Sequence, residues 1–317
     1  MASAVFRVVF AGPHVTVQDG GRVGMMRFGV TGSGPMDRKA FAIANAALGN
    51  APGAAGIEVS LGGLTLDCVA GAVSVAVVGG GFIVEAGGRK TGSWSVVEIR
   101  AGQRLVVRRG PWGSWCYLSF AGHLRATEWL GSAATHGPSG LGGGRVMTGQ
   151  EVVVEAASLR GEGAVPCPVW ARPRHGVACV LGPQERFFDV ETLRDFTHAP
   201  FEMTDAYDRM GVRLRGPSLV PVGALSIPSE AILRGSVQVA GDGVATVLLA
   251  DHQTTGGYPK IATLVADDVD GLVQCRPKEM IRFRAISAKE AVAVARSRGA
   301  RFHGYLAGLG VALHKNL

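Results

Sequence analysis

Charged and aromatic residues are scarce in this sequence. Of its 317 residues only 18% are charged and 7% are aromatic, whereas 47% are hydrophobic and 47 are glycine. So large an apolar fraction excludes a disordered chain and supports a sizeable core in one or two domains. The many glycines and few aromatic residues predict short strands joined by tight turns and disfavour a helical bundle.

Cysteine and histidine patterns typical of disulfide or metal frameworks are also missing. The cysteines form no C-x-x-C pair, and the histidines show neither H-x-H nor H-E-x-x-H spacing. We therefore expect no metal site and no structural zinc. An odd number of widely spaced cysteines predicts a reducing, cytoplasmic location. The cysteines are Cys68, Cys116, Cys167, Cys179 and Cys275.

Long apolar segments are nearly absent. Residues 68–84 carry no charge and just reach the roughly 17 residues that a membrane helix needs. Their glycines and β-branched residues instead predict two buried strands around a Gly79-Gly80-Gly81 turn. The first residues lack the pattern of a signal peptide, which agrees with the cytoplasmic expectation.

Nucleotide and nucleic-acid motifs are missing too. The net charge is +7, but the basic residues are scattered and form no basic block interleaved with aromatic residues. A diffuse positive field suits small anionic substrates, so we expect no nucleic acid as a partner. The sequence G-G-R-K-T at 87–91 lacks P-loop spacing, which argues against an autonomous Walker-type ATPase.

The distribution of apolar residues predicts a mainly β fold with a few helices. A helix is expected after Asp37 and before Gly49, another over 190–196, and a third from the capping box Ser287-x-x-Glu290 to Gly299. Residues 161–178, rich in proline, glycine and arginine, are the predicted linker between a β domain over 1–160 and another over 179–317. Alternating or apolar runs predict strands over 5–10, 57–66, 73–78, 96–99, 105–108, 115–120 and 152–155.

Residues 251–262, D-H-Q-T-T-G-G-Y-P-K-I-A, are the most informative part of the chain. Gly256 and Gly257 can take positive φ and expose N–H groups to an anion. Pro259 then favours extended geometry, so that Tyr258 and Lys260 project from a stiff backbone. The alternative is a hairpin turn with a lysine whose stem lies along the surface.

The first half of the chain carries further candidates. Arg22, after Asp19-Gly20-Gly21, is either a bidentate carboxylate or phosphate clamp or a surface arginine. Asp37 is either a helix N-cap or a site residue, and Asn45, among alanines, needs hydrogen-bond partners if buried. Glu58 lies in an apolar strand, where periodicity does not decide whether it faces the core or the solvent.

The second half offers Asp208-Arg209-Met210-Gly211, Glu230 and Gln238. The alternative for Asp208 and Arg209 is a solvated pair in a turn.

Several motifs resemble blocks of one family. The blocks are residues 251–262 together with T-V-Q-D-G-G-R at 16–22, G-V-T-G-S-G-P-M-D at 29–37, A-N-A-A-L-G-N at 44–50, G-I-E-V-S-L-G-G at 56–63, Y-L-S-F-A-G at 117–122, L-G-S at 130–132, D-R-M-G-V-R-L-R-G at 208–216 and S-V-Q-V at 236–239. With these blocks the sequence is similar to the carboxyltransferase subdomain family that includes the C-type subunit of 5-oxoprolinase, allophanate hydrolase subunit 2 and KipA-like proteins, and to the second half of the urea carboxylase carboxyltransferase domain.

This resemblance implies two β-barrel-like subdomains, of which the C-terminal one is cyclophilin-like. The chain departs from the family pattern at Tyr207, where members commonly carry serine, at Ala121-Gly122-His123, where they often show two glycines, and at Gly80-Gly81, where Gly-Ala is frequent. Because of these departures, the resemblance does not identify the substrate.

The activity implied is that of one subunit of an ATP-dependent 5-oxoprolinase complex, which opens the lactam of 5-oxoproline to give glutamate. ATP, with Mg, is the expected co-substrate, and an allophanate-hydrolase-subunit-1-like protein is the expected partner. Lys260 and the Gly256-Gly257 amides would stabilise the anionic oxygen, with Asp37, Glu58 or Asp208 as base. The predicted substrate-binding residues are Arg22, Asn45, Arg209, Glu230, Gln238, Thr254, Thr255, Gly256, Gly257 and Tyr258.

Two alternatives stay open. One is biotin-dependent carboxyl transfer to urea or another amide-like acceptor; the chain has no M-K-M sequence, so biotin would arrive on another chain. The serine/lysine constellation of amidase-type allophanate hydrolases is absent. The other alternative is a non-catalytic KipA-like regulator that binds an inhibitor protein. For catalysis we expect one site between the two β domains, since candidate residues fall on both sides of the linker.

Overall fold

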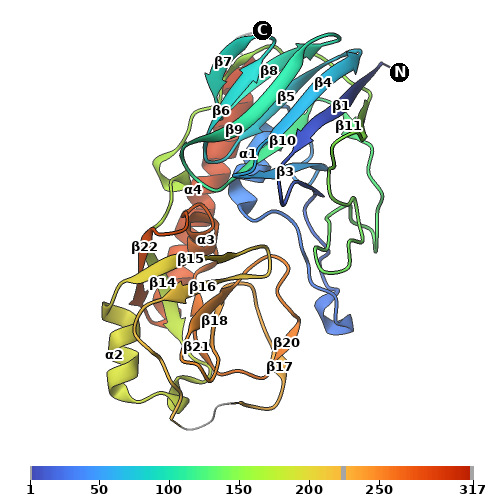
Figure 1. Ribbon diagram of the computed structural model, residues 1–317. Helices are drawn as coiled ribbons and strands as arrows, with labels where there is room; N and C mark the ends of the chain where they lie inside the picture. Colours follow the sequence, from blue (N-terminus) through green and yellow to red (C-terminus); the bar gives the residue numbers. More distant parts are fainter. Residues whose placement is uncertain (1, 223–225, 315–317) are drawn as a thin grey trace. The chain divides into compact units, whose positions relative to one another are not determined.

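The computed structural model describes residues 2–222 and 226–314. Strands account for 38% of the residues and helices for 18%, which confirms the mainly β fold class. Figure 1 shows these strands and the helices α1 to α4 along the chain. Among the described residues, no helix has the length and hydropathy that crossing a bilayer requires.

The chain divides into two compact units. Unit 1 comprises the described parts of Met1–Arg22, Ser33–Arg172 and Phe302–Leu317, and unit 2 comprises Val23–Gly32 and Pro173–Arg301. The long helix α4, Ala288–His314, contributes residues to both.

Unit 1 contains two antiparallel sheets. The seven-stranded sheet has the order β11-β12-β1-β4-β9-β6-β7, and the six-stranded sheet has the order β13-β8-β5-β10-β3-β2. The strands are β1 Ser3–Ala11, β2 Thr16–Gln18, β3 Gly56–Ser60, β4 Leu64–Ala70, β5 Ala72–Val78, β6 Gly81–Ala86, β7 Arg89–Gly92, β8 Ser95–Arg100, β9 Arg104–Trp112, β10 Trp115–Phe120, β11 His123–Leu124, β12 Glu151–Glu155 and β13 Gly163–Ala164.

The uncharged run at 68–84 passes from one sheet to the other. β5 lies in the six-stranded sheet and β6 in the seven-stranded sheet, so the expected two strands are confirmed. β5 is buried almost throughout, whereas β6 alternates between buried and partly exposed residues. Gly79 and Gly80 have φ of 105° and 50°, which L-residues rarely adopt, and this conformation lets the chain turn between the sheets.

The other strand predictions of unit 1 are confirmed in position, with one exception. The run at 57–66 is two strands, β3 and β4, because Gly63, with φ of 81°, turns the chain after Ser60. β3 then pairs with β10 and β2, whereas β4 pairs with β1 and β9.

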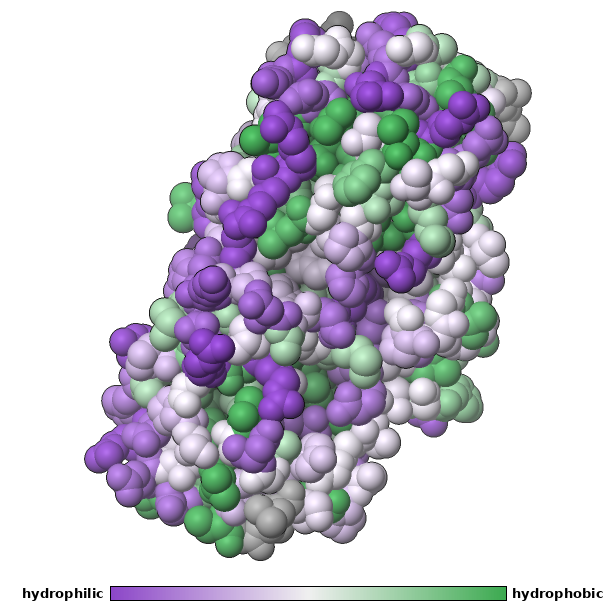
Figure 2. Space-filling model, viewed as in Figure 1, coloured by the Kyte–Doolittle hydropathy of each residue, from purple (hydrophilic) through white to green (hydrophobic). Residues whose placement is uncertain are grey.

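The outer face of the seven-stranded sheet mixes ion pairs with apolar side chains, as the interleaved purple and green areas over these strands in Figure 2 show. Asp67 pairs with Arg104 and Glu85 with Arg108. The Arg104 guanidinium holds the pKa of Asp67 below its usual range. Val9 is among the exposed apolar side chains here.

Helix α1, Arg38–Ala46, follows Asp37 as predicted and contacts β10 and β5. The predicted linker 161–178 contains β13, the 3₁₀ helix η2, Val169–Ala171, and the start of a strand of unit 2.

Unit 2 is built around a closed barrel of seven strands in the order β14-β21-β18-β19-β16-β15-β22. A short ribbon of β17 and β20 accompanies it. The strands are β14 Gly176–Leu181, β15 Phe201–Tyr207, β16 Gly211–Arg215, β17 Glu230–Ala231, β18 Ser236–Val239, β19 Ala245–Leu248, β20 Thr255–Gly256, β21 Lys260–Leu264 and β22 Met280–Ala285.

In unit 2, sequence signals predicted where two helices begin but not where α4 ends. α2, Val190–His198, begins after the N-cap Asp189, as predicted. α4 begins after the predicted Ser287–Glu290 capping box, in which Ser287 Oγ accepts a hydrogen bond from the Glu290 N–H. The predicted end of α4 at Gly299 is wrong, since the helix continues to His314. α3, Ala266–Leu272, was not predicted. The 3₁₀ helices are η1, Met26–Phe28, and η3, Glu185–Phe187.

Candidate functional site

Lys260 is the first residue of β21, and its side chain is buried with 4% of its surface exposed. The expectation that it projects from a loop is therefore wrong. Its Nζ lies 3.2 Å from Oε2 of Glu230. The same carboxylate oxygen accepts a hydrogen bond of 2.6 Å from Nε2 of Gln184. A buried ammonium is costly unless it is paired, and this carboxylate supplies the partner.

The backbone fixes the lysine in place. The Lys260 N–H donates to Oε1 of Gln184 over 3.1 Å, and the Gln184 N–H donates to the Lys260 carbonyl over 3.1 Å. The Gln184 side chain thereby binds both the backbone of β21 and the Glu230 carboxylate that pairs with Lys260. Gln184 follows the cis peptide bond Gly182-Pro183, and the G-P-Q sequence was the signal in the chain that could have marked it.

Glu230 connects the buried Lys260 to the solvent. Its side chain is 48% exposed, and the Lys260 ammonium holds the pKa of its carboxyl below the usual value of 4.5. The Glu230 carboxyl is therefore ionised near neutral pH and lies partly in solvent, beside the buried lysine. Such a lysine can donate to an anionic or carbonyl oxygen that approaches from the Glu230 side.

The Gly256-Gly257 pair has a different role from the one predicted. Neither glycine has positive φ, so that part of the prediction is wrong. Gly256 pairs with Glu230 in the β17–β20 ribbon. A Cβ added at Gly256 would lie 2.6 Å from Nε2 of Gln238 and 2.6 Å from the Ile232 side chain. A side chain at this position would displace the Gln238 amide and the end of the Ile232 side chain.

Gln238 lies opposite Lys260 in the β18–β21 pairing. It is buried, and its Oε1 accepts a hydrogen bond of 3.2 Å from Gln253. Within the part of the chain that the structure describes, its Nε2 has no hydrogen-bond partner. A buried donor without a partner costs free energy, so this amide is suited to donate to a ligand oxygen.

A cavity of about 690 Å³ in unit 2 is lined by Gln238, together with Gln253, Asp208 and Tyr258. The Tyr258 side chain is 47% exposed, so its ring reaches the solvent beside the cavity as the Tyr-Pro sequence predicted. The cavity is large enough for a small-molecule substrate. Thr254 and Thr255 adjoin it in sequence and hold the ribbon through backbone contacts to Ile232 and Ala231.

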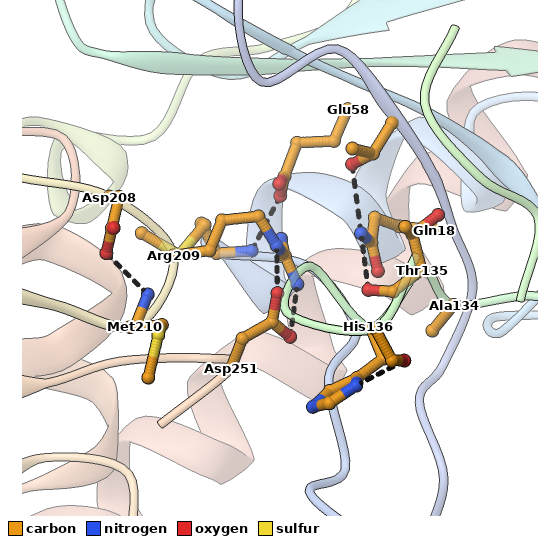
Figure 3. A network of polar contacts seen from close by, with 12 residues as sticks. Gln18, Glu58, Ala134, Thr135, His136, Asp208, Arg209, Met210 and Asp251 are labelled. Atoms are coloured by element: carbon orange, nitrogen blue, oxygen red, sulfur yellow. Dashed lines mark hydrogen bonds and ion pairs between the residues drawn. The ribbon is translucent and has the colours of Figure 1, made fainter. Parts of the chain in front are cut away.

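Asp208 and Arg209 are adjacent in sequence but face different partners (Figure 3). Asp208 is exposed, and its Oδ1 accepts hydrogen bonds from the N–H groups of Met210 and Gly211. Arg209 is buried and binds Asp251 with Nε and Nη2, at 2.8 and 3.1 Å. Asp208 is thus available beside the cavity, whereas Arg209 is engaged in a bidentate ion pair.

His252, next to Asp251, received no role from the sequence. Burial lowers the pKa of its imidazole, and its Nδ1 lies 2.6 Å from the Gln253 carbonyl. It is therefore neutral near pH 7 and helps to fix the loop that carries Gln253.

Unit 1 holds the other predicted residues, and Arg22 is buried there. Its Nε donates to the Trp129 carbonyl over 2.9 Å, and its Nη2 donates to the carbonyls of Ser132 and Ala134. Asp19 binds the same segment through the Ser132 hydroxyl and the Ala133 N–H, each at 2.6 Å. These bonds fasten two segments of unit 1 together.

Gln18 extends this attachment by donating from Nε2 to Thr16 and to the Thr135 carbonyl, as Figure 3 shows.

Glu58 is fully buried, which answers the question that its strand pattern left open. Its Oε2 accepts a hydrogen bond of 2.7 Å from the Met36 N–H. The neighbouring Asp37 N–H donates to the Tyr117 hydroxyl over 2.6 Å, and Asp37 Oδ1 caps α1 at the Ala40 N–H. Burial and the two carboxylates raise the pKa of Tyr117 well above its usual value.

Asn45 is also buried and supports the loop after α1. Its side-chain amide donates to the Ala54 carbonyl over 3.0 Å, and its Oδ1 accepts from Asn50.

A cavity of about 430 Å³ in unit 1 is lined by residues from 86 to 97 and 162 to 164, and none of the predicted site residues is among them. The structure therefore places Gln238, Asp208 and Tyr258 around one cavity of unit 2. The Lys260–Glu230 ion pair does not line that cavity, and Lys260 is connected to it through its strand pairing with Gln238. Asp37 and Glu58 lie within unit 1. A single site shared by the two units stays a prediction.

Comparison with known proteins gives a consistent result. A family model described as carboxyltransferase domain, subdomain A and B, matches residues 28–285. The C-type subunit of 5-oxoprolinase from Escherichia coli is 31% identical over 91% of this chain and 93% of that protein. The urea amidolyase of Saccharomyces cerevisiae is 27% identical over 88% of this chain and 16% of that protein.

The solved structure of urea carboxylase from Kluyveromyces lactis shows the same fold, with a TM-score of 0.85 at 23% identity. The alignment covers 96% of this chain and 29% of that one, so the chain corresponds to one part of a much longer protein.

Proposed function

Since the chain belongs to the carboxyltransferase domain family, subdomains A and B, we propose that it is one subunit of a cytoplasmic, ATP-dependent 5-oxoprolinase-type complex. Its substrate is a small lactam, and its product is the ring-opened amino acid. The relative that carries the 5-oxoprolinase name aligns over nearly its whole length, whereas urea amidolyase aligns over a small part of its own. This difference in coverage favours the lactam reaction.

The observation that carries the proposal is the pairing of Lys260 and Gln238 on adjacent strands of the barrel. One provides a buried ammonium, and the other a buried amide whose Nε2 has no partner within the described residues. Both are donors without acceptor capacity at those atoms, and they suit the carbonyl and carboxylate oxygens of 5-oxoproline. Preorganised donors of this kind are the largest common source of transition-state stabilisation.

The reaction needs activation because a lactam carbonyl is a poor electrophile. ATP transfers its terminal phosphoryl group to the lactam oxygen and leaves as ADP. Water then adds to the ring carbon, the C–N bond breaks, and the nitrogen takes a proton to become the free amine. A second water hydrolyses the resulting acyl phosphate to the carboxylate of glutamate and phosphate. In this sequence of steps Lys260 and Gln238 stabilise the negative charge that develops on oxygen.

Asp208 is the base that this geometry favours. Its carboxylate lines the same cavity as Gln238, and backbone N–H groups hold its Oδ1. Glu58 and Asp37 are buried in unit 1, where they bind the backbone at the start of α1. A general base must reach the water that it deprotonates, and the exposed Asp208 meets this requirement within unit 2.

ATP binding is assigned in part to a partner, because the sequence contains no P-loop. The partner we propose is an allophanate-hydrolase-subunit-1-like protein, equivalent to the B-type subunit of 5-oxoprolinase. We expect a stable heteromer that buries more than about 2,000 Å² in total. Light scattering coupled to size exclusion tests this expectation, and separate monomers in a mixture of both proteins would contradict it.

The test of function is co-expression with the allophanate-hydrolase-subunit-1-like protein, followed by an assay for ATP-dependent release of glutamate from 5-oxoproline. The parent complex should form glutamate and ADP in equal amounts. A complex carrying Lys260→Met is the matched negative control. Intact complex without any ATP-dependent glutamate formation would sink the proposal.

Carboxyl transfer from biotin is the second candidate, favoured by the family model and by the urea amidolyase relative. Carboxybiotin, supplied on another chain, would release CO2 for transfer to an amide-like acceptor, and the same donors would stabilise the ureido oxygen. The two functions separate in one experiment. The first consumes ATP with 5-oxoproline alone, whereas the second requires a biotinylated carrier and bicarbonate, and avidin would inhibit it. A complex inert in both assays would leave the KipA-like regulatory role.

A further inference from the structure

Three residues with metal-binding side chains meet at one end of the barrel in unit 2. The ligand atoms of His175, Cys275 and Glu279 all lie within 4.8 Å of one another. Nε2 of His175 is 3.3 Å from Oε2 of Glu279. His175 precedes β14, whereas Lys260 aligns near the other end of that strand, so this cluster is separate from the candidate site.

The backbone holds these residues in place. β14 and β22 are parallel neighbours, and the Arg282 N–H donates to the His175 carbonyl over 2.7 Å. Glu279 closes a turn with Arg276, and its carbonyl accepts a hydrogen bond from Met203. The Cys275 N–H donates to the Leu272 carbonyl at the end of α3. The three side chains thus come from three anchored segments, as a preformed site requires.

The three side chains differ in solvent accessibility, so that a cation could enter the cluster from one side. Cys275 is buried, His175 is exposed and Glu279 is intermediate. A cation entering from the His175 side would meet the sulfur at the bottom. Oε2 of Glu279, which faces His175, also accepts a hydrogen bond of 3.2 Å from the Arg276 N–H, and this bond orients the carboxylate toward the imidazole.

We propose that His175, Cys275 and Glu279 bind one zinc-type divalent cation, with water in the fourth position. Imidazole, thiolate and carboxylate are the three ligand types that Zn²⁺ takes in proteins, at bond lengths of about 2.0–2.3 Å. Ligand atoms of one tetrahedral ion therefore lie within about 4 Å of one another, so small rotations of the exposed His175 and the partly exposed Glu279 side chains would close the site. The sulfur makes the set softer than an all-oxygen site, which favours zinc over magnesium.

Cys275 would exchange one interaction for another on binding. Its Sγ now donates to the Arg174 carbonyl over 3.6 Å, and burial raises the pKa of the thiol to about 12. A bound metal deprotonates a coordinating thiol, so the cation would replace this proton. Sequence patterns do not reveal the site, because His175 lies 100 residues before Cys275 and no short-spacing motif joins them.

The experiment uses the full chain stripped with a chelator, dialysed against zinc chloride and, separately, titrated with cobalt chloride. We expect one zinc per chain by mass spectrometry and a thiolate-to-cobalt charge-transfer band in the ultraviolet. His175→Asn and Glu279→Gln should weaken zinc binding by at least the roughly 10–100-fold seen when an outer-shell partner is lost. Cys275→Ser should abolish the charge-transfer band.

Matched controls are Cys179→Ser and His198→Asn. Cys179 is a second buried cysteine of unit 2 whose pKa is raised to about 12, and His198 is an exposed histidine of the same unit. Both variants should bind zinc as the parent does. If Cys275→Ser fails to fold, the variants at the exposed His175 and the partly exposed Glu279 still decide whether zinc binds here. A parent chain that retains no zinc, or ligand variants that bind as tightly as the parent, would overturn the proposal.

Discussion

Buried charged side chains occur in both units, but their partners differ. In unit 1, the buried Arg22 and Glu58 bind backbone carbonyl and N–H groups. In unit 2, Lys260 binds a half-exposed carboxylate, and Gln238 faces a cavity. Similar glycine-bounded sequence blocks thus have two outcomes. In unit 1 their charged side chains hold segments of the backbone together, and in unit 2 their side chains leave hydrogen-bond donors that a ligand can reach. Burial alone does not distinguish the two, whereas the identity of the partner does.

The largest expected effect is a loss of turnover on changing Lys260, which tests whether the buried lysine of unit 2 acts on a ligand. Lys260→Met in the complex should lower turnover about a hundredfold or more, as loss of an oxyanion donor does. Its thermal stability should change little, because Met fills a similar volume and the Glu230 left behind is half exposed to solvent. Steady-state kinetics and a melting curve measure both quantities. Turnover equal to the parent would reduce the lysine to a structural residue.

The next effect concerns Arg22 of unit 1, where a substitution should lower stability and leave turnover nearly unchanged. Arg22→Met removes hydrogen bonds to the carbonyls of Trp129 and Ser132, so the free energy of unfolding should fall by about 1.5–3 kcal/mol. Urea denaturation measures this change. For protein that remains folded, turnover per active complex should stay near the parent value. A normal denaturation midpoint combined with a large loss of turnover would show that Arg22 is a clamp on the substrate after all.

A smaller effect is expected at Gln238. Gln238→Met removes the Nε2 donor that has no partner within the described residues, and it also removes the hydrogen bond that Oε1 accepts from Gln253. Because Gln253 is exposed and water can replace that bond, stability should change little. The loss of one hydrogen bond to the developing oxyanion should lower kcat/KM about tenfold. Initial-rate kinetics over a range of lactam concentrations provides the measurement. The conservative control is Gln238→Glu, which keeps the shape but offers an acceptor in place of the donor.

The smallest effect is a pH dependence of stability that comes from the Lys260–Glu230 pair of unit 2. Lys260 lowers the pKa of Glu230 below 4.5, so the ion pair stabilises the fold above that value and its contribution disappears as the pH falls through the lowered pKa. Thermal melts between pH 3 and 6 should therefore show a slightly weaker acid sensitivity in Glu230→Gln than in the parent. Identical profiles would show that the pair contributes nothing measurable.

Strand positions were predictable where one face of a strand is buried and the other is not. β12 alternates between buried and less buried residues, and its position was predicted. β3 is buried along its whole length, so its pattern held no information about which way Glu58 points. A strand covered on both faces loses the two-residue period from which orientation is predicted.

Helix ends and the site depended on contacts between distant residues. Gly299 predicted the end of α4, but it lacks the positive φ of a glycine cap, and the helix tolerates it at a cost of about 1 kcal/mol. α3 was missed because its buried Asp268 is stabilised by Arg174 and Arg298, which lie far away in sequence. The burial of Lys260 likewise follows from Glu230, a contact that no local pattern reveals.

The closure of the barrel affects how the chain is made. β14 is the first barrel strand to be synthesised, yet its partners are β21 and β22, and β22 ends about 100 residues later. At ribosomal rates of about 5–20 residues per second, β14 waits roughly 5–20 s before both of its edges can pair. During that interval its open edges can pair with strands of other nascent chains. Slower elongation should therefore lower the yield of correctly folded protein.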